Sequence, residues 1–157
     1  MPRTEKRLKV LFLCSGNSCR SQMAEGWARH LKGTQIEPYS AGVEPHPLDP
    51  RAVRVMAEAR VDISRQRPKH VRDMMGIEFD YVVTVCDAAR EACPHFPGRA
   101  KVVHRSFDDP PRLAAGADTE EEALAHYRRV RDEIRAFVQA MPSSLEQQKE
   151  TPQRRND

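Results

Sequence analysis

The sequence predicts an α/β protein in which a parallel sheet carries helices on both faces. Short apolar runs of strand length alternate along the chain with longer segments whose apolar residues recur at helical spacing. The chain has 157 residues, enough to close one hydrophobic core. We find no internal repeat and no change of composition that would mark a second domain.

The chain begins with a strand, a tight loop and a helix. Lys9–Leu13 is an apolar run consistent with a buried strand. Residues 14–21 are small and polar, as in a loop. A helix should follow and end near Gly33, with one buried face formed by Met23, Ala24, Trp27, Ala28 and Leu31.

The next two elements are a weaker strand and a well-capped helix. Ile36–Ser40 has strand character but contains Pro38, which favours an edge position in the sheet. Asp49 followed by Pro50 is typical of a helix N-cap and first helical residue. The buried face of that helix should consist of Ala52, Val53, Met56 and Ala57.

Two further strands and a long helix complete the predicted domain. Asp80–Val85 and Lys101–His104 have strand character, and Thr119 with Glu122 forms a capping-box pattern that begins a helix reaching Met141. We therefore predict one catalytic domain over residues 1–141. The polar composition of residues 142–157 predicts a disordered C-terminal tail.

Composition excludes several classes of protein. The chain has 26 Lys and Arg against 23 Asp and Glu, a net charge of +3, which argues against a nucleic-acid binder. No run of apolar residues is long enough for a membrane span, and no signal peptide is recognisable, so we expect a cytoplasmic protein. Its four cysteines then indicate catalytic or metal-binding thiols rather than a disulfide framework.

The loop after the first strand has the composition of an anion site. Cys14 and Arg20 bracket five residues, and a loop between a strand and a helix can point its N–H groups into one concavity. Arg20 offers a planar fork for two oxygens of a tetrahedral anion, and the same field favours a thiolate at Cys14. Gly16 permits close backbone approach, and Asn17 tolerates a positive φ. The predicted substrate-binding residues are Ser15, Gly16, Asn17, Ser18, Cys19, Arg20 and Ser21.

Other readings of this loop fit less well. The sequence lacks the Gly-Lys-Ser/Thr ending of a nucleotide-binding phosphate loop and lacks a dinucleotide-binding glycine pattern. The cysteine spacings differ from those of zinc sites, so we expect no metal or other cofactor. A merely buried Cys14 is the remaining alternative, although it leaves Arg20 and the loop unexplained.

Six short motifs stand out between residue 9 and about residue 140. They are Val10–Gly26 (VLFLCSGNSCRSQMAEG), Tyr39–Gly42, Val82–Cys86, Cys93–Pro94, Phe107–Pro110 and Arg129–Ile134. Together these motifs resemble arsenate reductases built on the low-molecular-weight tyrosine phosphatase fold. The resemblance implies a low-molecular-weight phosphatase-like three-layer sandwich around a four-stranded parallel sheet. It also implies that Cys14 is the nucleophile, Arg20 the oxyanion clamp and Asp109 the general acid, with Asp108 as the neighbouring candidate.

The same loop serves phosphatases and arsenate reductases, so the choice between them depends on whether the protein can supply the two electrons of a reduction. Phosphate ester hydrolysis needs one thiolate and one acid. Reduction of arsenate to arsenite needs two electrons, which a dithiol supplies when it becomes a disulfide. Cys86 and Cys93 are the candidate extra thiols, and two ordinary buried cysteines are the alternative. A low-molecular-weight phosphatase, or a non-enzymatic anion-binding or thiol-signalling protein, would not need them.

For a reductase the resemblance implies a disulfide relay through Cys14, Cys86 and Cys93, regenerated by thioredoxin, with phosphate and sulfate as competing anions. Residues seven apart on a helix lie about 10.5 Å apart, whereas a disulfide joins Cα atoms roughly 4.4–6.8 Å apart. We therefore expect residues 86–98 to differ most between redox states. Cys19 has no necessary role in this scheme.

Two departures from the family pattern matter. Low-molecular-weight phosphatases usually carry tyrosines after the Asp-Pro pair, whereas Pro111-Arg112-Leu113 stands here, which argues against tyrosine phosphate as substrate. Some reductases of the family bind potassium through residues that match Asn17, Glu25 and Ser40. Lys69 stands where their fourth ligand is an aspartate, so we expect its ammonium to replace the ion.

Overall fold

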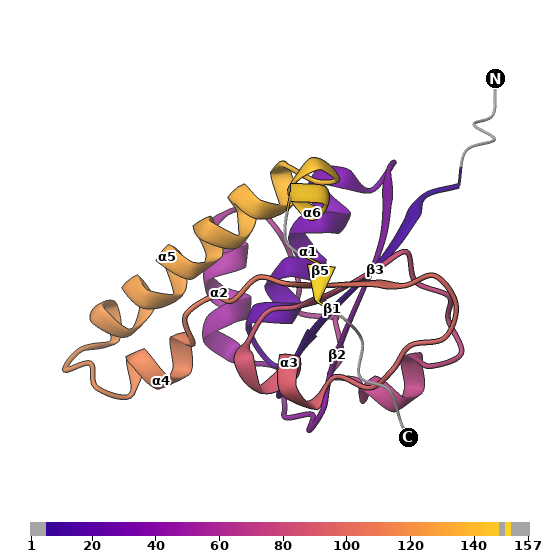
Figure 1. Ribbon diagram of the computed structural model, residues 1–157. Helices are drawn as coiled ribbons and strands as arrows, with labels where there is room; N and C mark the ends of the chain where they lie inside the picture. The colour runs from indigo at the N-terminus through magenta and orange to yellow at the C-terminus, as the bar shows by residue number, and fades with distance from the viewer. Residues whose placement is uncertain (1–5, 148–149, 152–157) are drawn as a thin grey trace.

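The strands of the computed structural model form one sheet in the order β2-β1-β3-β4-β5 (Figure 1). The model describes residues 6–147 and 150–151. The first four strands are parallel, as predicted, and the short fifth strand pairs antiparallel with β4. The strands are β1 Leu8–Cys14, β2 Ile36–Gly42, β3 Tyr81–Thr84, β4 Lys101–His104 and β5 Glu150–Thr151.

Helices lie on both faces of this sheet. The connections from β1 to β2 and from β3 to β4 step in opposite directions, so right-handed crossovers put α1 and α3 on opposite faces. Helices α2 and α5 pack against α1 and complete one outer layer (Figure 1). The predicted three-layer sandwich is thus confirmed. The helices are α1 Arg20–Lys32, α2 Pro50–Glu58, a 3-10 helix η1 Val71–Met74, α3 Asp87–Ala92, α4 Pro110–Ala114, α5 Glu120–Gln139 and α6 Ser143–Gln147.

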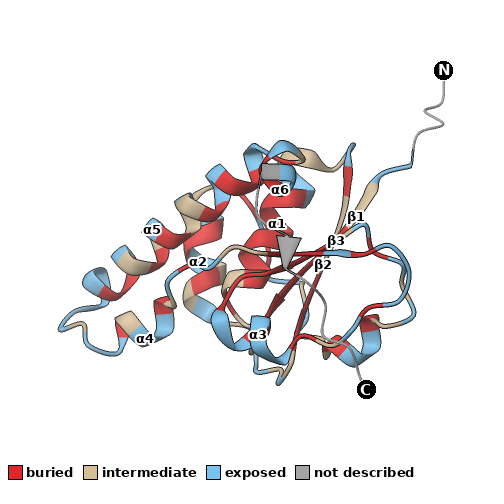
Figure 2. Cartoon of the chain, in the orientation of Figure 1, coloured by how far each residue is buried: buried red, intermediate tan, exposed pale blue. Residues whose placement is uncertain are grey.

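The core lies on both sides of the central strands. Residues Val10–Leu13 of β1 are completely buried, and because their side chains alternate they fill both inter-layer spaces. Helix α1 is buried over residues 21–28, because the sheet covers one side of it and α2 and α5 pack against it, whereas α5 has a buried side and an exposed side (Figure 2). An edge-to-face series of Tyr39, Phe79 and Phe96 adds aromatic packing.

Local signals in the sequence predicted several element boundaries. Asp49 caps α2 by accepting a hydrogen bond from the backbone N–H of Arg51 at 2.9 Å, and Thr119 caps α5 by accepting one from Glu122 at 3.1 Å. Strand β2, which contains Pro38, lies at an edge of the sheet as predicted. A proline is tolerated there because an edge strand leaves part of its backbone unpaired.

The predicted disordered tail is wrong in its first part. Residues Ser143–Gln147 form α6, in which Leu145 is buried and the Ser144 hydroxyl donates to the carbonyl of Phe137 at 2.8 Å. One apolar residue in a polar segment gives no periodic pattern, so the sequence did not reveal this turn of helix. The domain thus continues beyond residue 141 to α6 and β5, and residues 148–149 and 152–157 lie outside the described part.

Candidate active site

The predicted anion loop occupies the turn between β1 and α1, at the carboxyl edge of the sheet. Cys14 is the last residue of β1 and Arg20 the first of α1, so the loop lies at the positive end of a 13-residue helix. Asn17 adopts a positive φ of 50°, as the sequence suggested. Gly42 lets β2 approach, because a Cβ there would lie 2.7 Å from the carbonyl oxygen of Ser15.

Two hydrogen-bond donors surround the buried sulfur of Cys14. The backbone N–H of Asn17 donates to Cys14 Sγ at 3.2 Å, and the Asn17 amide donates to Ser21 Oγ at 2.8 Å. Ser21 Oγ in turn lies 3.0 Å from Cys14 Sγ. Because Ser21 accepts from Asn17, its own hydrogen is available to the sulfur. Two donors therefore converge on Cys14 Sγ and fix the position of this sulfur in the loop.

Cys19, the other cysteine of the loop, is in a different electrostatic environment. It is buried at the start of α1, and burial together with the carboxylate of Asp49 raises the pKa of its thiol well above the usual value. Cys19 is therefore a protonated thiol at neutral pH. This difference separates the two cysteines of the loop chemically.

The side chains of Arg20 and Asp109 lie close together beside the cavity over the loop. Arg20 Nη1 donates to the carbonyl of Phe107 at 2.8 Å, and its Nη2 lies 3.7 Å from Asp109 Oδ1. The neighbouring Asp108 instead pairs with Arg129 at 2.9 Å. Of the two candidate acids, the structure thus brings Asp109 to Arg20.

A cavity of about 200 Å³ opens over the loop, large enough for a tetrahedral oxyanion. His46, which the sequence does not single out, lies at this cavity because its backbone N–H donates to the carbonyl of Gly16 at 2.8 Å. No local sequence signal connects two segments 30 residues apart in this way. The cavity over the loop is lined by Cys14, Ser15, Gly16, Ser18, Cys19, Arg20, His46, Asp109 and Pro111.

Cys86 and Cys93 flank the short helix α3. Cys86 is its N-cap, where Sγ accepts from the backbone N–H of Ala89 at 3.4 Å and lies 3.9 Å from the hydroxyl of Ser15 in the anion loop. Cys93 is its C-cap. All four cysteines are thiols in this structure. With α3 intact, Cys86 and Cys93 are about 10.5 Å apart by helical rise, so a disulfide between them requires unwinding.

The ammonium of Lys69 lies beside Glu25, one of the residues that match potassium ligands in some reductases of the family. Its ammonium lies 3.6 Å from Glu25 Oε1, which also accepts from the hydroxyl of Ser40 at 2.6 Å. The backbone N–H of Lys69 donates to the side chain of Asn17 at 2.8 Å and so supports the strained residue of the loop. Burial lowers the pKa of Lys69, and the carboxylate of Glu25 opposes this shift.

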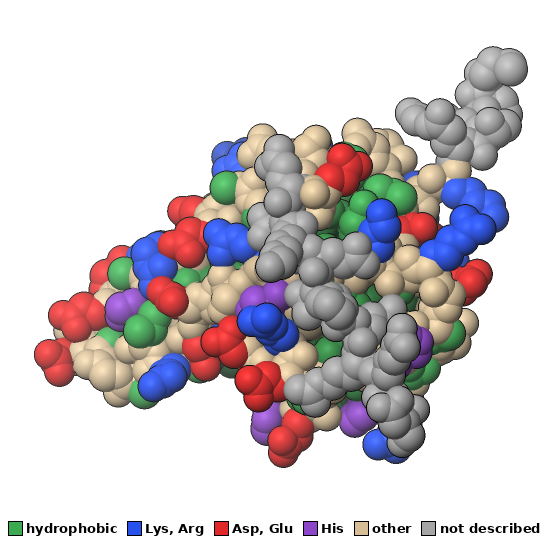
Figure 3. All heavy atoms as spheres, viewed as in Figure 1, with side chains coloured by type: hydrophobic (Ala, Val, Ile, Leu, Met, Phe, Trp, Pro, Cys, Tyr) green, Lys and Arg blue, Asp and Glu red, His purple; other side chains and the backbone are tan. Residues whose placement is uncertain are grey.

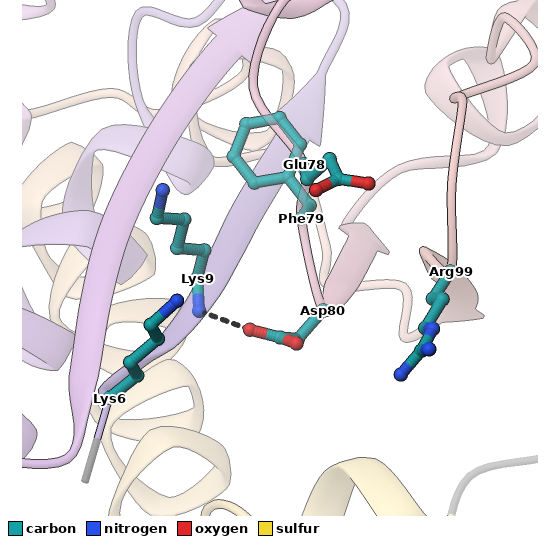
Figure 4. Close-up of a pocket in the computed structure, with 6 residues that line it drawn as sticks. All are labelled: Lys6, Lys9, Glu78, Phe79, Asp80 and Arg99. Atoms are coloured by element: carbon teal, nitrogen blue, oxygen red, sulfur yellow. Dashed lines mark hydrogen bonds between the residues drawn. The ribbon is translucent and has the colours of Figure 1, made fainter.

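A larger cavity of about 430 Å³ lies at the other end of the strands (Figure 4). Lys6, Lys9, Asp80 and Arg99 line it, and the Lys9 N–H donates to Asp80 at 2.8 Å. The residues that line this cavity include no cysteine, serine or threonine, and Glu78 and Asp80 offset its basic groups. Elsewhere on the face seen in Figure 3, acidic and basic side chains intermingle. Attraction of an anion to the loop therefore depends on local donors.

The helices in the described part of the chain are too short or too polar to span a membrane. No group of three or more His, Cys, Asp or Glu side chains there is arranged to hold a metal ion.

Comparison with known proteins identifies the family. Residues 9–151 match the model for low molecular weight phosphotyrosine protein phosphatases. An arsenate reductase of Bacillus subtilis is 50% identical over 125 residues, covering 80% of this chain and 88% of its own. A solved arsenate reductase in the reduced state has a TM-score of 0.67 at 29% identity, with 88% and 98% of the two chains covered.

A third relative is a thioredoxin-dependent arsenate reductase of Corynebacterium glutamicum. Its structure aligns with a TM-score of 0.62 at 27% identity, covering 90% of this chain and 65% of that one. The relatives named here are thus reductases, although the family model carries the name of phosphatases. By sequence and by structure, this chain belongs to the low molecular weight phosphotyrosine protein phosphatase family.

Proposed function

We propose that this protein is an arsenate reductase that converts arsenate to arsenite through Cys14, Cys86 and Cys93. The observation that carries the proposal is the position of Cys86, whose sulfur lies 3.9 Å from the hydroxyl of Ser15 in the anion loop. A hydrolytic phosphatase has no use for a second thiol there. Identity of 50% to the Bacillus subtilis arsenate reductase supports the same conclusion.

In the first step the anion loop binds arsenate and Cys14 attacks arsenic. Loop N–H groups, the positive end of α1 and the guanidinium of Arg20 stabilise the oxyanion. Asp109 protonates the departing oxygen, which leaves as water while the S–As bond forms. The Arg20–Asp109 distance of 3.7 Å leaves the carboxyl close to the cavity in which that oxygen would lie.

The next two steps transfer electrons through disulfides. The Cys86 thiolate attacks Cys14 Sγ, the S–As bond breaks, and its electron pair remains on arsenic, which leaves as arsenite. Cys93 then attacks Cys86 and releases Cys14 as a thiolate. Helix α3 must unwind for this last exchange. Because the helix has six residues, the conformational change involves only a short segment.

Thioredoxin is the proposed reductant of the final disulfide. Transfer of the disulfide from the buried Cys14 to Cys93 brings it to a segment whose neighbours Arg90, Glu91 and His95 are exposed. A protein dithiol can reach it there. We also propose a cytoplasmic location, where thiols are kept reduced.

The rival function is hydrolysis of phosphate monoesters through a Cys14 phosphocysteine. It requires Cys14, Arg20 and Asp109 but neither Cys86 nor Cys93. The aromatic side chains with which such phosphatases bind tyrosine phosphate are missing beside the site, where Pro111 lines the cavity. This observation favours a small inorganic anion as substrate.

Coupled steady-state assays test the proposed function. With thioredoxin, thioredoxin reductase and NADPH, we expect arsenate-dependent NADPH oxidation that phosphate or sulfate inhibits competitively, because these anions have the same shape and charge as arsenate. Hydrolysis of p-nitrophenyl phosphate should be slow. Rapid ester hydrolysis without arsenate-dependent oxidation would instead establish the phosphatase.

Potassium is expected to have little effect on arsenate reduction. The ammonium of Lys69 already contacts the carboxylate of Glu25, which a potassium ion would otherwise neutralise. Rates in KCl and NaCl at equal ionic strength should therefore agree, while the Lys69→Asp variant should gain stimulation by potassium. A severalfold increase of the unsubstituted protein's rate in KCl would contradict this role of Lys69.

A further inference from the structure

A chain of three polar side chains connects the sheet to the helix between the relay cysteines. Thr84, at the end of β3, is completely buried, and its hydroxyl lies 2.7 Å from Nδ1 of His104 on the neighbouring strand β4. The other ring nitrogen of His104, Nε2, lies 3.0 Å from Oδ1 of Asp87. The His104 side chain is 15% exposed and that of Asp87 is 81% exposed.

The hydrogen-bonding capacity of these groups gives the chain a direction. An ionised Asp87 carboxylate only accepts, so Nε2 of His104 carries a proton and donates to it. In the neutral ring Nδ1 then accepts, and the hydroxyl of Thr84 donates to it. Both ring nitrogens of His104 thus have a hydrogen-bond partner.

Asp87 is the first residue of α3 and directly follows Cys86. A helix of six residues is not stable by itself, so contacts with the rest of the protein must hold it. Within α3 only Ala89 is buried. The bond from His104 to Asp87 is therefore one of the contacts that attach the first turn, beside Cys86 at the anion loop.

We propose that His104 and Asp87 are positioning residues that stabilise the reduced, helical form of the Cys86–Cys93 segment. The inference rests on the proposed reductase function. Formation of the disulfide requires α3 to unwind, which carries Asp87 away from His104. A contact present only in the dithiol form favours that form, so it raises the reduction potential of the Cys86–Cys93 pair and makes its disulfide easier for thioredoxin to reduce.

Redox titration of the full-length chain tests this proposal. Cys14→Ser and Cys19→Ser are introduced together so that only Cys86 and Cys93 exchange with glutathione. The dithiol and oxidised glutathione are in equilibrium with the disulfide and two reduced glutathiones, and the fraction oxidised is measured by thiol alkylation. The same background then receives Asp87→Ala, which removes the acceptor of the His104 hydrogen bond, His104→Asn, both together, or Glu91→Gln as a control for charge on an exposed position of α3. Asparagine at 104 keeps a polar group beside Thr84 but is too short to reach Asp87.

Each of Asp87→Ala and His104→Asn should increase the equilibrium constant for oxidation about two- to fivefold, as expected for an exposed pair. This corresponds to a reduction potential about 10–20 mV more negative. The double variant should shift no further than the larger single shift, because both substitutions remove the same contact. Glu91→Gln should leave the constant unchanged.

Three results overturn the proposal or its premise. Unchanged constants in both single variants would show that the contact does not stabilise the dithiol. Fully additive shifts would show that Asp87 and His104 act separately, for example through the effect of the Asp87 charge on the helix. Failure of Cys86 and Cys93 to form a disulfide in any variant would contradict the reductase relay itself, which distinguishes the two failures.

Discussion

The Cys86→Ser variant is expected to lose arsenate reduction completely while it keeps slow hydrolysis of p-nitrophenyl phosphate. Serine leaves the anion loop, Arg20 and Asp109 in place, so Cys14 still attacks a bound tetrahedral anion. It cannot supply the second thiol, so no electron pair reaches arsenic. Arsenite production with the thioredoxin system and ester hydrolysis, measured on the same preparation, distinguish the two activities.

Cys93→Ser provides the matched comparison. In this variant Cys86 still expels arsenite, so one turnover should proceed and stop at a Cys14–Cys86 disulfide. The structure supports this order because Cys86 is the thiol beside the loop and Cys93 lies at the far end of α3. Continued arsenate turnover by Cys86→Ser would contradict the relay, and so would loss of ester hydrolysis in a correctly folded variant.

The Asp109→Asn variant should reduce arsenate about 10²–10⁴-fold more slowly, the usual contribution of a general acid. An amide keeps the shape of the carboxyl but has no proton to give to the departing oxygen. In a Cys93→Ser background, where the Cys14–Cys86 disulfide accumulates, the rate at which this disulfide forms after mixing with arsenate reports on the affected step. Arsenate affinity should change far less than the rate, because Arg20 and the loop remain.

Asp108→Asn is the control for this prediction. Asp108 is exposed and pairs with Arg129 on α5, away from Arg20. Its replacement loses one surface ion pair, which typically contributes below about 1 kcal/mol to stability. An equal loss of rate in both variants would mean that the acid loop is merely distorted, and a larger loss for Asp108→Asn would reverse the assignment.

Features that depend on local chemistry could be predicted from the sequence. The apolar run before Cys14 predicted β1, and the Asp49-Pro50 and Thr119 signals predicted the starts of α2 and α5. The anion loop was recognisable because cysteine, small residues and arginine must be consecutive there. In each case the interacting residues are close together in the chain.

Features that depend on register and tertiary packing could not be predicted. His46 reaches the cavity only because β2 ends beside the loop, and His104 meets Thr84 only because β3 and β4 pair in a particular register. Helix α6 contributes one buried apolar residue, too few for a periodic signal. Such contacts join residues far apart in sequence, and neither propensity nor spacing encodes them.

The most direct test of the central claim is the stoichiometry of one turnover without external reductant. The fully reduced protein is mixed with excess arsenate, and arsenite, remaining thiols and disulfide connectivity are measured together. We expect one arsenite per chain, a loss of two thiols, and a disulfide between Cys86 and Cys93. Retention of all thiols with no arsenite formed would contradict the proposal that this chain reduces arsenate through its own cysteines.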